Sequence, residues 1–172
     1  PTMRAVIQPP SRPLVRPGDV TLDLFVSYLS GGGASRAPVR LRTMLEPRTP
    51  GFRDYPDFTF AGEDVREGIS TPDQRDDDEW WYASRFGYDR PDGGDTATPA
   101  QVQPLVLDEQ GAARATVKLP AVDQPRTLVA ELEYDDANGE RLTTATRVPL
   151  WPAALSLGIR TDGWVATQDD LR

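Results

Sequence analysis

The stretch that decides the fold runs from Arg12 to Pro47, with the sequence RPLVRPGDVTLDLFVSYLSGGGASRAPVRLRTMLEP. In its first half one face carries the apolar residues Val20, Leu22, Leu24, Val26 and Tyr28, and the other carries Thr21, Asp23 and Ser27. A period of two is typical of a strand with one face in a core and the other toward water. A second alternating run, from Val39 to Leu45, follows the glycines at 31–33. Two alternating runs around a glycine-rich connection predict an antiparallel pair of strands.

A second block of alternating sequence spans Leu105 to Leu150. Its clearest part is a hairpin, in which Leu128–Tyr134 and Leu142–Val148 flank the turn residues Asp135–Gly139. Asn-Gly at the end of that turn favours a hairpin because both residues accept positive φ. With an edge-like strand at Met3–Gln8, the chain has about seven strands and no sustained helical pattern. The prediction is an all-β antiparallel sandwich of immunoglobulin-like or fibronectin-like architecture.

Residues 51–104 differ in composition from both strand blocks, and we predict that they form a long insertion in the sandwich. They hold 13 acidic and 5 basic residues, which accounts for the whole net charge of -8, and nine of the fourteen aromatic residues. Ser70–Glu79 and Asp89–Pro104 have the polar, proline-containing composition of loops. Asp57–Phe60 is a candidate short strand within the insertion.

Three consecutive aromatic residues stand directly after an acidic run in this insertion. The acidic run is Asp76, Asp77, Asp78 and Glu79, and the aromatic residues are Trp80, Trp81 and Tyr82. Such rings should not all stay in water, since each can bury roughly 150–250 Å². Either they fold back on the insertion or the sandwich, or they anchor a partner, because Trp and Tyr dominate interface hot spots. The acidic run is either a solvated loop or a surface for a basic partner.

Histidine and cysteine are both absent from the chain. Their absence removes the commonest general base, the commonest transition-metal ligand, disulfides and thiolate metal sites. We interpret Asp135 and Asp136 as turn residues rather than as a glycosidase carboxylate pair. The spacing of Asp89, Asp92 and Asp95 does not match a calcium-binding loop. We therefore expect no catalysis, no metal and no cofactor, and the negative charge argues against a nucleic-acid partner.

A proline-bounded hinge, Pro149-Leu150-Trp151-Pro152, follows the last predicted strand. Trp151 is interpreted as a plug at a domain junction. Beyond it, Leu155–Ile159 and Trp164-Val165 predict the opening strand of another domain. The predicted organisation is thus one sandwich over residues 1–150, then a hinge and the first strand of a next domain over 151–172. With no signal segment at its start, the chain is expected to be a piece of a larger array.

Five elements, in this order, carry a family resemblance: RPGDVTLDLFVSYL, APVRLRTMLEPR, YPDFTFAGEDVREGI, LVAELEYDDANGERLTTATRVPLWPA and LGIRTDGWVATQDDLR. Together they resemble bacterial α2-macroglobulin-like proteins. The resemblance implies a macroglobulin-type β-sandwich domain from a very large exported protein that traps proteases in the periplasm, often through a parent anchored by a lipidated N-terminus. The family's thioester needs a cysteine two residues before Glu-Gln. Here Glu109-Gln110 follows Leu107 and Asp108, so the thioester does not lie in this chain.

On this resemblance we expect a non-catalytic structural and interaction domain of a protease-inhibiting, bacterial-defence protein. Its expected partners are neighbouring macroglobulin-like domains, target proteases through the whole protein, and other cell-envelope proteins. The alternative from another class is a standalone fibronectin-like adhesion or carbohydrate-binding module, with Trp80, Trp81 and Tyr82 as a sugar-stacking platform. The parent sequence would discriminate the two, because it would show either many similar units or a short modular adhesin.

Overall fold

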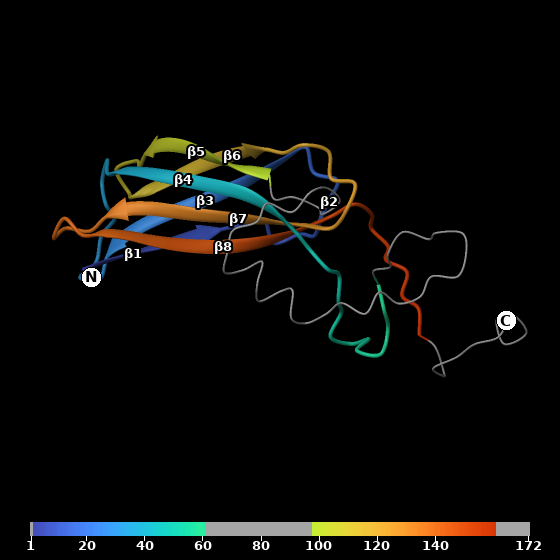
Figure 1. Cartoon of the computed structure of the whole chain (residues 1–172). Helices are drawn as coiled ribbons and strands as arrows, with labels where there is room; N and C mark the ends of the chain where they lie inside the picture. The colour runs from blue at the N-terminus through green and yellow to red at the C-terminus, as the bar shows by residue number, and fades with distance from the viewer. Residues whose placement is uncertain (1, 61–97, 161–172) are drawn as a thin grey trace, which may run out of the picture.

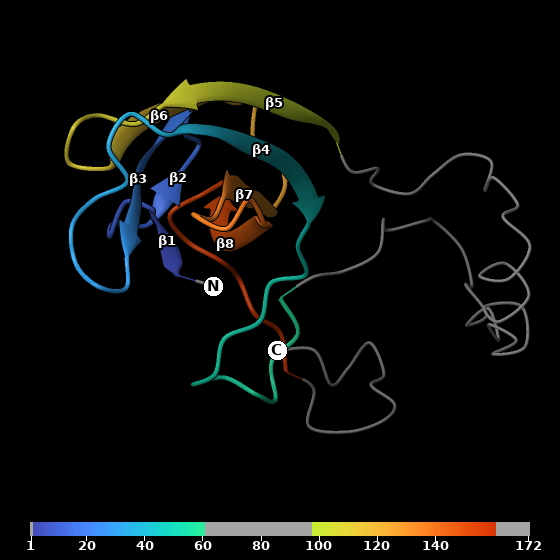
Figure 2. The same ribbon diagram turned by 90° about the vertical axis from the view of Figure 1, so that its left-hand side faces the viewer.

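Strands in two layers make up the part of the chain that the computed structural model describes, residues 2–60 and 98–160 (Figures 1 and 2). They are β1 (Met3–Gln8), β2 (Leu14–Val15), β3 (Asp19–Tyr28), β4 (Pro38–Pro47), β5 (Thr98–Val106), β6 (Ala112–Lys118), β7 (Arg126–Asp135) and β8 (Arg141–Trp151). One sheet has the order β1-β3-β6 and the other the order β2-β8-β7-β4-β5. Neighbouring strands are antiparallel except for β2 and β8. The all-β sandwich predicted from the sequence is confirmed, and no helix of the described residues could span a membrane.

The core between the two sheets is almost wholly aliphatic. The largest fully buried side chains are Leu22, Leu24, Leu41, Leu107, Leu128, Leu132, Leu150, Val20 and Val26. The predicted strand faces are therefore correct: Leu24 and Leu132 are completely enclosed, whereas Phe25 on the opposite face of β3 is 43% exposed. Tyr28, which the same alternation placed inside, is 39% exposed because it stands at the end of β3, where the strand leaves the core.

The two halves of the Arg12–Pro47 stretch do not form the predicted antiparallel pair. β3 lies between β1 and β6, whereas β4 lies between β5 and β7 in the other sheet. Each strand fills one side of the same core, so the glycine-rich loop between them carries the chain across the sandwich. Alternation shows which face of a strand is buried, but it does not show which strand lies beside it.

Two glycines allow this crossing loop to pack against the turn between β5 and β6. Gly111 has a φ of 78°, a left-handed backbone that favours glycine, and its carbonyl accepts a hydrogen bond from the Val26 amide at 2.9 Å. A Cβ on Gly33 would overlap the Gln110 carbonyl, and a Cβ on Gly111 would overlap the Val26 carbonyl. The two backbones approach this closely only because neither glycine carries a side chain.

The predicted hairpin of the second block is confirmed as β7 and β8, which pair from Arg126 with Leu150 to Asp135 with Arg141. Its loop comprises residues 136–140, one position later than the turn Asp135–Gly139 predicted from the sequence. The Asp136 amide donates to the Glu140 carbonyl, and the Gly139 amide donates to the Asp136 carbonyl. Gly139 has a positive φ of 77°, as expected for the glycine of an Asn-Gly turn, but Asn138 does not have a positive φ.

The strand β5 corrects the predicted end of the insertion. Residues 98–104 were expected to be loop, but they pair with β4, where Pro104 lies opposite Arg40. Prolines and glutamines give the segment a loop-like composition, yet prolines are tolerated in an edge strand, and β5 is the edge of its sheet. On the outward face Val102 is 55% and Val106 is 67% exposed. The second strand block thus begins at Thr98 rather than at Leu105.

Candidate functional site

Aromatic side chains from two distant segments pack together where β8 ends. Figure 1 shows residues 48–60 and 151–160 leaving the same end of the sandwich side by side. We call Phe52, Tyr55, Phe58, Phe60 and Trp151 the junction cluster. The Phe52 ring meets the Phe60 ring edge-on at 4.6 Å between centroids, and it stacks on Trp151 at 5.7 Å. Tyr55 meets Phe58 edge-on at 5.7 Å. These are the favoured geometries of aromatic pairs.

Two arginines hold the hinge that carries Trp151. The Arg16 amide donates to the Trp151 carbonyl at 2.8 Å, and its Nε donates to the Pro152 carbonyl at 2.6 Å. On the other side, the Arg48 guanidinium lies 5.3 Å from the centroid of the Trp151 ring, a cation–π distance. The hinge is thus fixed from β2 on one side and from the end of β4 on the other. The predicted role of Trp151 as a plug between domains stays a prediction.

The segment after the hinge is attached to the same cluster. Thr59 and Ile159 exchange backbone hydrogen bonds of 2.8 and 2.9 Å, so the candidate strand Asp57–Phe60 forms a single antiparallel bridge. A Cβ on Gly158 would lie 2.6 Å from the nearest atom of the Phe60 ring, so the ring rests on the bare backbone. The Arg160 guanidinium lies 5.4 Å from the centroid of Phe58. Three successive contacts therefore join residues 58–60 to residues 158–160.

An apolar groove of about 370 Å³ opens beside the cluster. Its lining comprises Pro13, Val15, Phe52, Tyr55, Phe60, Trp151, Ala153, Ala154, Leu155 and Ser156. Several of these side chains are exposed, including Val15 at 40%, Tyr55 at 55% and Leu155 at 86%. Among the residues that the structure describes, the lining includes no carboxylate, lysine or arginine, so this part of the groove suits an apolar surface rather than a charged ligand.

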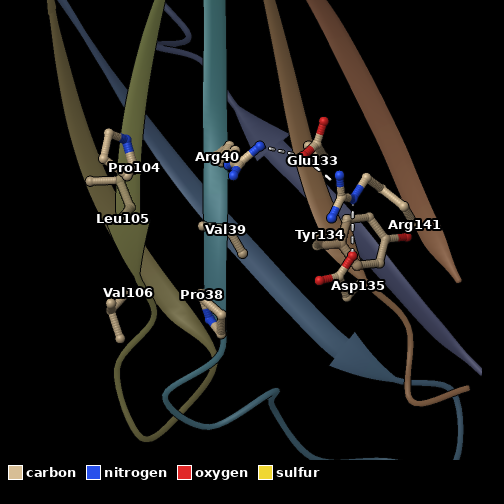
Figure 3. Close-up of a pocket in the computed structure, with 10 residues that line it drawn as sticks. All are labelled: Pro38, Val39, Arg40, Pro104, Leu105, Val106, Glu133, Tyr134, Asp135 and Arg141. Atoms are coloured by element: carbon tan, nitrogen blue, oxygen red, sulfur yellow. Dashed lines mark hydrogen bonds and ion pairs between the residues drawn. The ribbon is translucent and has the colours of Figure 1, made fainter. Parts of the chain in front are cut away.

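A second hollow, of about 350 Å³, lies over β4, β5 and the β7–β8 hairpin (Figure 3). Figure 3 shows Arg40 and Arg141 directed at Glu133 from two sides, at 3.5 and 3.6 Å, with Arg141 also 3.2 Å from Asp135. The hydrogen bond to Asp135, followed by the charges of Asp135 and Glu133, raises the pKa of Arg141. Both carboxylates therefore face guanidinium groups, and the hollow is an ion-paired surface.

Asp136 has a role that the local sequence did not indicate. It is only 4% exposed, and its carboxylate accepts hydrogen bonds of 3.0–3.2 Å from the amide and hydroxyl of Thr2, 134 residues away. Burial alone would raise its pKa, but hydrogen bonds from Thr2 and from the backbone of Asn138 and Met3 hold the pKa of Asp136 below its usual range. The neighbouring Tyr134 has a raised pKa, first through burial and then through the negative charge of Asp136. Asp136 thus ties the start of β1 to the β7–β8 hairpin.

The partner-binding residues predicted from the insertion cannot be placed in this arrangement. Asp76, Asp77, Asp78, Glu79, Trp80, Trp81 and Tyr82 lie outside the described residues. Their role stays a prediction, and a deletion that tests it has to stop before Thr98, where β5 begins. Over residues 2–60 and 98–160 the structure brings together no group of three or more His, Cys, Asp or Glu side chains that could hold a metal ion.

The fold of this chain has counterparts among solved structures. No family model matches the chain, and no curated protein matches it in sequence. In fold, the chain is similar to native Escherichia coli α2-macroglobulin, with a TM-score of 0.64 and 18% identity over 95% of this chain. Trypsin-activated E. coli α2-macroglobulin matches 93% of this chain with a TM-score of 0.64, and Salmonella α2-macroglobulin reacted with methylamine matches 92% with a TM-score of 0.63, both at 18% identity. The fold is that of a bacterial α2-macroglobulin domain.

This macroglobulin-like chain spans about 9% of the length of the three solved chains just named. The resemblance found in the sequence is therefore confirmed as a likeness of fold between this chain and a domain-sized part of those proteins. The macroglobulin-like sandwich has its junction cluster outside its own core, at the end where the chain leaves β8.

Proposed function

We propose that this chain is a non-catalytic structural and interaction domain of a large bacterial α2-macroglobulin-like protein that traps and inhibits proteases. The observation that carries the proposal is the fold match over 95% of this chain to only 9% of a much longer chain. Two of the matched E. coli structures are of the protein activated by trypsin and by porcine elastase. By extension, we propose that target proteases bind the complete protein to which this domain belongs, here called the parent protein. We further propose that the parent protein works in the periplasm and is attached to the membrane by a lipid anchor.

The arrangement of the described residues supports a mechanical role. The sandwich has a closed aliphatic core, while the hinge at Trp151 is held by Arg16 and Arg48 rather than left free. A domain of this kind can pass a change of position from one neighbour to the next without changing its own fold. We accordingly propose that residues 151–172 form the hinge and opening strand of a next macroglobulin-like domain, and that neighbouring domains of the same chain are the direct partners.

The test compares the parent protein with the isolated 172-residue chain. Each is incubated with several endoproteases, and the digestion of a protein substrate is then followed. The expected result is inhibition by the parent, no inhibition by the isolated chain, and loss of inhibition when the parent is unfolded beforehand. Stoichiometric inhibition by the isolated chain, or a folded parent that leaves every protease active, would overturn the proposal. Fractionation of the source bacterium checks the periplasmic location separately.

A further inference from the structure

We infer that the junction cluster is a brace that holds residues 155–159 as the first strand of a second apolar layer, supplied by the same polypeptide beyond residue 160. The inference rests on the proposed place of this chain in a multidomain protein. Beyond that proposal, it identifies the side chains that orient the first strand of the next domain.

One side of the segment after the hinge is apolar and uncovered among the described residues. Leu155 is 86%, Leu157 is 90% and Ile159 is 71% exposed, and Ser156, Gly158 and Arg160 alternate with them. A contiguous apolar row in water marks an interaction surface. Its period of two is that of a strand with one face in a core.

The first strand of the present sandwich shows what such a row becomes when a core is available. In β1, Met3, Ala5 and Ile7 alternate with Arg4, Val6 and Gln8. Met3 is only 5% and Ile7 only 8% exposed, because both side chains lie in the core of this domain. Residues 155–159 repeat the pattern of β1 without the layer that covers it.

The opposite side of the same segment is occupied by the brace. Gly158 lies against the Phe60 ring, Arg160 lies over Phe58, and Ile159 is bonded through its backbone to Thr59. Gly158 and Arg160 thus face residues 58–60, whereas the exposed side chains of Leu157 and Ile159 make none of these contacts. The chain continues from Arg160, next to the exposed Ile159, so it can cover this row while the segment keeps its contacts with Phe58 and Phe60.

The groove beside the cluster extends the same surface toward the sandwich. Leu155 is at once the first residue of the exposed row and part of the groove lining, together with Val15 and Tyr55. A layer packed on Leu157 and Ile159 would also close part of this groove. The following unit would then contact both its own first strand and the end of the present domain.

A matched pair of glycine substitutions tests the brace. In Gly158→Ala, the new Cβ would displace the Phe60 ring, whereas in Gly51→Ala the new Cβ meets nothing within 4 Å. In the 172-residue chain we expect Gly158→Ala to speed amide hydrogen exchange at Thr59 and Ile159 by about tenfold or more, as local opening does, with β7 and β8 unchanged. Gly51→Ala should leave every rate as in the wild type. Equal exchange at Ile159 in the two variants would overturn the brace.

The layer beyond residue 160 is tested in the parent protein with Leu157→Asp. In the 172-residue chain Leu157 is exposed, so this change should leave thermal unfolding unaltered. In the parent it should reduce hydrogen-exchange protection at 155–159 and in the region that follows. If wild-type residues 155–159 are no better protected in the parent than in the 172-residue chain, the second layer does not exist. Neither readout involves a protease, so a parent that fails to inhibit would refute the proposed function and leave this inference standing.

Discussion

In the sandwich core the side chains are aliphatic and enclosed, whereas in the junction cluster they are aromatic and all keep part of their surface in water. Leu22, Leu24, Leu132 and Leu150 are 0% exposed, and Tyr134 is the one aromatic residue among the buried hydrophobic residues that the structure describes. Phe52, Phe58, Phe60 and Trp151 are half-buried, and Tyr55 is exposed. The core is closed, whereas the cluster keeps aromatic surface exposed, which is the composition typical of interaction surfaces.

The difference separates two physical tasks within one chain. Close packing of aliphatic side chains determines whether the domain folds, because each one removed leaves a cavity. Pairwise contacts between rings at the surface contribute less to folding, but they fix where the chain goes after β8. The substitutions below therefore separate effects on stability from effects on the junction.

The largest loss is expected from truncation in the core. Leu24→Ala or Leu132→Ala should cost about 2–5 kcal/mol, a large share of the roughly 5–15 kcal/mol by which a domain is stable. Phe25→Ala, on the exposed side of the same strand, should cost less, although it removes more atoms. Chemical denaturation measures all three, and a nearly neutral Leu24→Ala would contradict the idea of a closed aliphatic core.

A smaller loss is expected at the loop that crosses the sandwich. Gly111→Ala should destabilise the domain by about 1–3 kcal/mol, the cost of a strained left-handed residue, because the φ there is 78° and the Cβ would strike the Val26 carbonyl. Gly51→Ala, with open space and no positive φ, is the control and should be neutral or slightly stabilising. Thermal unfolding of the two variants checks this, and equal midpoints would show that the crossing tolerates a side chain.

The hydrogen bonds between Thr2 and Asp136 should make the free energy of unfolding depend on pH. The pKa of Asp136 is lower in the folded state than in the unfolded state. Its contribution to the free energy of unfolding is therefore fully present above the usual carboxylate pKa of about 4. That contribution is lost as the pH falls through the lower pKa of the folded state. Asp136→Asn should therefore be less stable than the wild type at pH 7, and the difference should shrink in acid. Thr2→Val, which removes the hydroxyl donor and leaves the amide, should be intermediate. Parallel stability curves for wild type and Asp136→Asn would rule the link out.

Truncation in the junction cluster should barely affect the unfolding of the domain. Phe60→Ala should cost well under the roughly 3–5 kcal/mol of a core Phe→Ala, because its ring contacts Phe52 and Gly158 outside the core. The same variant should lose protection from hydrogen exchange at Ile159. A loss of stability as large as that of Leu24→Ala would show that the cluster belongs to the folding core after all.

The smallest effect is expected on the outer face of the three-stranded sheet. Arg114 Nε lies 2.7 Å from the Asp23 carboxylate, and this hydrogen bond lowers the pKa of Asp23. The Arg114 side chain nevertheless remains 72% exposed and the Asp23 side chain 37% exposed. Water and salt screen such a pair, so its net contribution is small. A double-mutant cycle with Asp23→Asn and Arg114→Gln should give a coupling close to experimental error, and a large coupling would contradict this expectation.

Much of the sandwich could be predicted because alternation is a local property. The buried faces of β3, β4 and β7 follow from residues two apart, and the β7–β8 hairpin follows from two runs separated by a short turn. Strand pairing is not local in this sense, so β3 and β4 were wrongly placed side by side. In β5 the prolines at 99 and 104 concealed a strand, since the chain carries no local mark that this strand would lie at an edge.

The candidate site was predictable only in part, for the same reason. The proline-flanked Trp151 was picked out from the sequence, although its role between domains stays a prediction, and the aromatic content of residues 52–60 was visible in the composition. That Phe52 would stack on Trp151, or that Asp136 would hold Thr2, depends on contacts between residues about a hundred or more positions apart. Such contacts are set by the finished fold and leave no spacing in the sequence to recognise.

Pro104 has one further consequence, for the behaviour of the molecule in a crowded compartment. Its partner in β4 is Arg40, and the pairing on either side of it is unbroken, so the proline nitrogen faces the open side of β5, where it has no hydrogen to offer. A strand from another molecule could not form an uninterrupted ladder along this edge. The exposed valines at 102 and 106 can therefore remain in solvent without templating polymerisation through the sheet.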